Sequence, residues 1–153
     1  MAPRADFDVA AAHRYFAAAC FNATWDLIEK EDRTPADDQR MISLALASMY
    51  HWSERPDCGA TERSVGYWQV SRVHALVGLA GEARRYGEIC REVSGDLAPF
   101  YRGYAHEALA RAARLAGDTA AAAEHLAKAR ALASEITDDG ERELLVADLA
   151  TLG

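Results

Sequence analysis

The chain has 153 residues and a mass of 16.7 kDa, which is the size of one domain. Half of its residues are apolar and 27% are charged, so the composition excludes a disordered tail, a collagen-like fibre and a disulfide-dense miniprotein. The net charge of −7 offers no broad positive field to phosphate backbones or anionic lipid, and we expect neither nucleic acid nor a membrane as a partner.

Alanine fills 33 positions against 10 glycines and 4 prolines, which predicts an all-α protein. A first helix is expected over residues 7–30, with apolar residues on two adjoining faces. The next is marked by Thr34 as its N-cap and Pro35 at its first position, and a later one by Thr61 as a cap. Including these two, six helices are expected after the first one, at about 34–54, 61–77, 80–93, 97–116, 119–136 and 140–152. The chain would then form about seven helices in one domain over residues 1–153.

Two stretches repeat a helix–turn–helix plan. In the later one, Leu109 and Ala113 precede a turn at Gly117, and Ala122 and Leu126 follow at helical spacing. In the earlier one the turn glycine is Gly78, 39 residues before. Small residues let paired helices approach closely, and a turn glycine lets the chain reverse.

This pattern resembles the tetratricopeptide repeat (TPR), and the chain is similar to small bacterial proteins of this helical-repeat type. The resemblance implies antiparallel helical hairpins stacked as a short right-handed array. The hairpins would occupy about 7–54, 61–93 and 97–136, with a capping helix at about 140–152. It also implies a concave face, lined by the first helix of each pair, that binds a peptide or protein partner.

Signatures of catalysis and metal binding are missing from the sequence. It contains no His-Glu-x-x-His, no Glu-x-x-His, no Gly-x-Ser-x-Gly and no phosphate-binding glycine loop. We therefore expect no metal and no cofactor, and the missing signatures favour a protein that is not an enzyme. Three cysteines without a Cys-x-x-Cys spacing, and a start without an apolar segment typical of a signal peptide, favour a cytoplasmic location.

The three tryptophans, Trp25, Trp52 and Trp68, all precede residue 70, and hydrogen-bonding side chains lie within one helical turn of each. Aromatic rings that give shape, with a few polar groups that orient a ligand, are typical of a binding pocket. The opposing interpretation is that the rings fill a core and the polar groups satisfy their N–H donors. The candidate binding residues are Asn22, Trp25, Asp26, His51, Trp52, Trp68, Gln69 and Arg72.

Three functional hypotheses follow from these features. The leading one is a non-catalytic TPR-like protein that binds a peptide or protein partner, with Tyr101 and Tyr104 adding contacts. The alternative is a small-molecule-binding protein or cryptic enzyme with a pocket bounded by the three tryptophans, in which His51 is the acid–base candidate. The third is a structural homodimer that pairs through the apolar stripe Leu145, Leu149 and Leu152.

Overall fold

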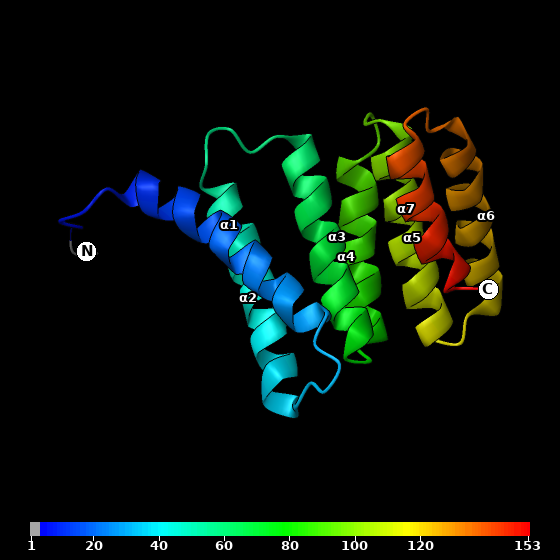
Figure 1. Ribbon diagram of the computed structural model, residues 1–153, viewed down its shortest axis with the longest axis horizontal. Coiled ribbons are helices and arrows are strands. Elements are labelled where there is room, and N and C mark those ends of the chain that lie inside the picture. The colour runs from blue at the N-terminus through cyan, green and yellow to red at the C-terminus, as the bar shows by residue number, and fades with distance from the viewer. Residues whose placement is uncertain (1–3) are drawn as a thin grey trace. The chain divides into compact units, whose positions relative to one another are not determined.

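The computed structural model describes residues 4–153, and these residues form seven α-helices and no strand (Figure 1). The prediction of an all-α protein is therefore confirmed, and every helix begins and ends within about two residues of its expected limits. Within the described residues no helix combines the length and the apolar composition needed to cross a bilayer. The helices belong to two compact units, one ending at Gly59 and the other running from Ala60 to Gly153.

The first unit is an antiparallel hairpin of α1 (Val9–Ile28) and α2 (Pro35–Ser53). The predicted start of α2 is confirmed: Thr34 and Asp37 form a reciprocal capping box, with Pro35 at the first helical position. The two helices approach closely where the buried hydroxyl of Ser48 donates to the main-chain carbonyl of Ala17 at 2.8 Å. Around this contact the core of the unit contains Thr24, Met41, Ala45 and Met49.

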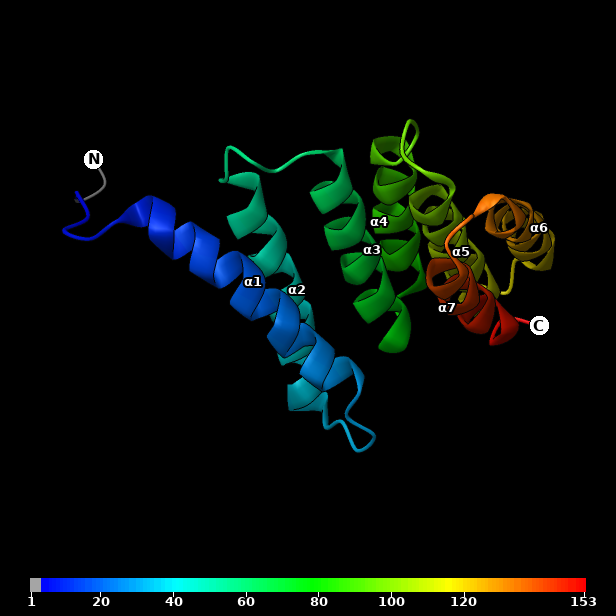
Figure 2. The same cartoon turned by 45° about the horizontal axis from the view of Figure 1, so that its top comes forward.

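The second unit has one helix at its centre and consists of α3 (Ala60–Leu76), α4 (Ala80–Val93), α5 (Pro99–Leu115), α6 (Thr119–Glu135) and α7 (Asp139–Ala150). Helix α5 packs against each of the other four, and α3, α4 and α5 lie side by side in both views (Figures 1 and 2). Its interior-facing positions are mostly alanine and glycine, which suits a helix with neighbours on several sides.

The two predicted turn glycines end α3 and α5 in the same way. Gly78 and Gly117 have φ values of +83° and +78°, a left-handed conformation that glycine adopts without steric cost. In both turns the residue after the glycine donates its N–H at 2.9 Å to a carbonyl five residues earlier, which closes a Schellman motif. The sequence prediction of a cap at Thr61 is wrong, because α3 already begins at Ala60 and Thr61 lies inside it.

Helix α7 closes the unit through an apolar stripe. Leu145 and Leu149 are buried with Ala129, Ala133 and Ile136, and Leu152 packs against this cluster. A Cβ atom added to Gly103 of α5 would lie 2.6 Å from a Leu145 methyl carbon, so a larger residue at this position would force the buried Leu145 side chain to shift. The stripe predicted as a dimer surface therefore belongs to the core of its own unit, because Leu145 and Leu149 are buried there rather than exposed.

Candidate functional site

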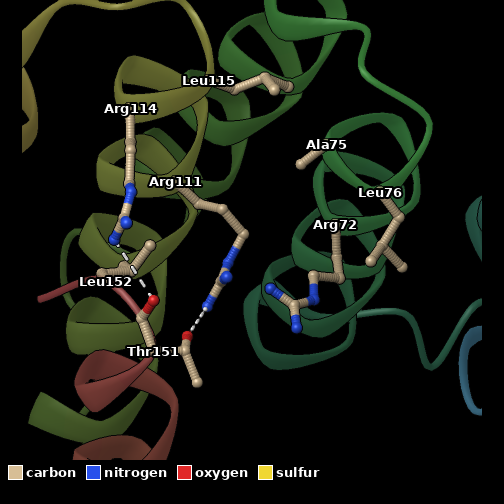
Figure 3. A pocket seen from close by; sticks show the side chains of 8 residues that line it. All are labelled: Arg72, Ala75, Leu76, Arg111, Arg114, Leu115, Thr151 and Leu152. Atoms are coloured by element: carbon tan, nitrogen blue, oxygen red, sulfur yellow. Dashed lines mark hydrogen bonds between the residues drawn. The ribbon is translucent and has the colours of Figure 1, made fainter.

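An open cavity in the second unit gathers three arginines from two helices (Figure 3). Arg72 comes from α3, and Arg111 and Arg114 from α5. The volume is about 480 Å³, within the range typical of ligand-binding sites. The remaining lining residues are mostly apolar: Ala75, Leu76, Leu115, Thr151 and Leu152.

A buried carboxylate holds two of these arginines in place. Glu107 of α5 is only 1% exposed, and its Oε1 atom accepts a hydrogen bond from Nε of Arg111 at 2.7 Å. Its Oε2 atom accepts the indole N–H of Trp68 at 2.8 Å, and Nη1 of Arg72 lies 3.8 Å from Oε1. A carboxylate can remain ionised in such a place only when it is paired and hydrogen-bonded. Glu107 thereby helps to hold Arg72 and Arg111 in position at the cavity.

Arg72 retains unused hydrogen-bonding capacity. Its Nη1 atom is buried and has no hydrogen-bond partner within residues 4–153, although Glu107 provides charge compensation at 3.8 Å. Burial lowers the pKa of Arg72, and the nearby charge of Arg111 lowers it further, whereas Glu107 raises it. Arginine nevertheless stays protonated in proteins, so Arg72 keeps its full positive charge beside the cavity.

The other two arginines bind oxygen atoms of the turn that follows α7. Arg111 donates through Nη2 to the hydroxyl of Thr151 at 3.0 Å, and Arg114 donates through Nη1 to its carbonyl at 3.3 Å (Figure 3). Asp148, one turn earlier, accepts the phenol hydrogen of Tyr104 at 2.7 Å. Burial and this carboxylate raise the pKa of Tyr104, so the phenol remains a donor at neutral pH.

The charges at the cavity do not cancel. Three guanidinium groups face it, and Glu107 and Asp148 are the carboxylates within the same network. Arg114 forms no ion pair with any of the described side chains. Among these three arginines and two carboxylates one positive charge is in excess, which suits a ligand with a single negative charge.

Of the predicted candidates, the structure brings Trp68 and Arg72 together at Glu107. Gln69 lies beside them on α3 and is buried. Tyr104 meets Trp68 edge to face, with ring centroids 5.4 Å apart. Glu107 was missed as the organising residue, although its i,i+4 spacing to Arg111 is a signal that the sequence does contain.

The remaining candidates lie on the two helices of the first unit. Asn22 and Asp26 are exposed on α1, while Trp25 and Trp52 are partly buried. The guanidinium carbon of Arg55 lies 3.9 Å from the centroid of the Trp52 ring, a cation–π contact. Trp68 belongs to the second unit, and the hypothesis of a pocket bounded by all three tryptophans stays a prediction.

Histidines pair across helices in both units, which the sequence did not reveal. The Nδ1 atoms of His13 and His51 are 2.9 Å apart, and those of His106 and His125 are 3.0 Å apart. Burial, followed by the charge of the neighbouring histidine, lowers the pKa of His51 and brings that of His106 to about 4. Across residues 4–153, no three or more histidine, cysteine, aspartate or glutamate side chains cluster as they would around a metal ion.

The fold and the site together define an all-α protein with an arginine-lined cavity. Comparisons with protein-family models, with curated proteins and with solved structures give no match for this chain. What the protein does is therefore inferred from the chemistry of this cavity.

Proposed function

We propose that the protein is a non-catalytic, TPR-like helical-repeat protein that binds a carboxylate of an acidic peptide or protein segment in its arginine-lined cavity. The observation that carries the proposal is the convergence of Arg72, Arg111 and Arg114 on one cavity. Guanidinium groups form strong, directional hydrogen bonds with carboxylates.

The lining favours recognition over chemistry. Its eight residues include three arginines, one threonine and four alanines or leucines. Arginine does not exchange protons near neutral pH, and the lining supplies neither a histidine nor a cysteine nor a carboxylate to act as base or nucleophile. A lining of this kind can orient a negatively charged group, but it supplies no side chain that could act on it as base or nucleophile.

Two features support a peptide as the occupant. Arg111 and Arg114 already bind the hydroxyl and the carbonyl of Thr151, so their positions suit the oxygen atoms of a polypeptide. The leucine and alanine side chains around them offer apolar surface to the aliphatic parts of a peptide. The matching glycine turns after α3 and α5 support the TPR-like arrangement of hairpins that the proposal includes.

The volume of the cavity favours a second candidate, a small carboxylic acid. About 480 Å³ is enough for a metabolite-sized ligand, and such a ligand would use the same three arginines. A short acid and a short acidic peptide are therefore compared directly in the experiment.

The test follows the indole N–H signal of Trp68 in ¹H–¹⁵N spectra of the full chain. Because this N–H donates to Glu107, which also holds Arg111, it reports changes at the arginines. We expect acetyl-Ala-Asp-Ala-amide to shift the signal and acetyl-Ala-Asn-Ala-amide to leave it in place. Butyrate is the small-acid probe, and tighter binding of butyrate than of the aspartyl peptide would favour the second candidate.

A pair of matched variants controls for net charge. Arg114→Gln removes a cavity arginine that lies outside the Glu107 contacts, so the fold is expected to persist while the response to the aspartyl peptide is lost. Arg84→Gln makes the same charge change at an exposed position of α4 and is expected to leave the response intact. Equal responses to the Asp and Asn peptides, or equal losses in the two variants, would refute the proposal.

A further inference from the structure

A second cavity adjoins the arginine-lined one. Its volume is about 260 Å³, and it shares Arg114 and Leu152 with its neighbour. The rest of its wall comes from α5 and α6 and consists mainly of small or apolar side chains, among them Ala122, Ala123 and Leu126. Arg114 and Leu152 therefore border both cavities.

The two cavities differ in chemistry. The first presents three guanidinium groups, whereas in the second Arg114 and Thr119 are the polar residues among seven. A volume of about 260 Å³ lies below the range of most small-molecule sites, and it suits one aliphatic side chain better than a whole ligand. Arg114, which borders both cavities, supplies the charge that places an acidic group next to that side chain.

We infer that the bound peptide carries an aliphatic side chain on the same face as its acidic residue, with the carboxylate in the arginine-lined cavity and the aliphatic group in the second cavity. This inference rests on the proposed function. In an extended peptide, side chains two residues apart point to the same face, so an Asp-x-Leu segment presents the required pair. The ligand class is thus an acidic–aliphatic peptide rather than an acidic peptide of any sequence.

The first experiment compares acetyl-Asp-Ala-Leu-amide with acetyl-Asp-Ala-Gly-amide by titration against the full chain. Removal of a leucine side chain from water into a partly open cavity is expected to lower the dissociation constant about tenfold relative to the glycine peptide. The same dissociation constant for both peptides would overturn the inference and leave the proposed function standing. A lack of binding by both peptides would overturn the proposed function itself.

A pair of variants locates the aliphatic site. Ala123→Met fills the second cavity from α6, so it is expected to abolish the preference for leucine while changing the affinity for the glycine peptide less than twofold. Ala127→Met places the same side chain at an exposed position of α6 outside the cavity and is expected to preserve the preference. Both positions are solvent-facing, and unchanged circular dichroism spectra would show that the helices are intact. A leucine preference that survives Ala123→Met would refute the placement of the aliphatic group.

Discussion

Replacement of Glu107 by glutamine tests whether the buried carboxylate organises the second unit. The substitution keeps the shape of the side chain but removes its charge. Glutamine can still accept the indole N–H of Trp68 through its oxygen, but its NH₂ group then faces Nε of Arg111, which is also a donor. Two donors facing each other, beside an uncompensated Arg72, leave the network short of acceptors.

The expected cost is worked from the contacts of Glu107. Its bond to Nε of Arg111, at 2.7 Å, is charge-assisted, and hydrogen bonds to charged groups contribute about 1.5–3 kcal/mol each. Breaking a buried ion pair by removing one partner typically costs about 3–5 kcal/mol. The side chains of Arg72 and Arg111 retain 20% and 18% exposure, so water can hydrate them in part. We therefore expect a loss near the lower limit, about 3 kcal/mol.

Urea unfolding followed by Trp68 emission, in a chain carrying Trp25→Phe and Trp52→Phe, measures the free energy of unfolding of the second unit. The control is Glu124→Gln, which removes a solvent-exposed ion pair with Lys128 whose atoms are 2.7 Å apart. Exposed pairs of this kind contribute little to stability, because water and salt screen the two charges. A cost for Glu107→Gln below about 1 kcal/mol, or one equal to that of the control, would refute the organising role of Glu107.

Three further predictions concern packing, protonation and thiol reactivity. Gly103→Ala is expected to lower the free energy of unfolding by about 1–2 kcal/mol, because crowding against Leu145 outweighs the gain in helix propensity; a more stable variant in thermal melts would contradict this. The melting temperature is expected to fall as the pH is lowered from 6.5 to 4, and to fall less in His106→Gln. The folded-state pKa of His106 is about 4, below its reference value of 6.5, so the unfolded chain takes up a proton at a higher pH than the folded chain does. The stability that is present above pH 6.5 is therefore lost as the pH falls towards 4. Identical pH profiles for the variant and the wild type would exclude His106 as the cause. Burial raises the pKa of Cys90 to about 11, so mass spectrometry after iodoacetamide treatment at pH 8 should find this thiol alkylated only when the protein is unfolded in urea; rapid alkylation of the native protein would show that it is accessible.

The features that could be predicted from the sequence are those fixed by neighbours along the chain. The capping box at Thr34 depends on residues three apart, and the turns at Gly78 and Gly117 depend on one residue that tolerates a positive φ. Helix limits follow from such signals, which is why they agree with the structure. The prediction of a cap at Thr61 is wrong because α3 already begins at Ala60. A threonine side chain suits an N-cap, but it does not fix the exact residue at which the helix starts.

The candidate site could be predicted only in part. Trp68 and Arg72 were recognised from their spacing on one helix, but their partner Glu107 lies 39 residues from Trp68 and meets it only through tertiary packing. The hydrogen bond between Arg111 and Thr151 also joins residues far apart in the sequence, since it depends on α7 folding back towards α5. The histidine pairs, whose members lie 38 and 19 residues apart, show the same limit. Helical periodicity predicts which side chains share one face of a helix, but it does not predict which other helix packs against that face.

The buried charge network also bears on the order in which the second unit folds. Successive helices pack as neighbours, and contacts of this local kind form quickly. The network, in contrast, joins Trp68 to Glu107 across 39 residues and Tyr104 to Asp148 across 44, so it closes only after α3, α5 and α7 have docked. A substitution that weakens only the network should leave the refolding rate nearly unchanged and accelerate unfolding. The network would then determine the unfolding rate of the second unit, and the helical hairpins would determine its folding rate.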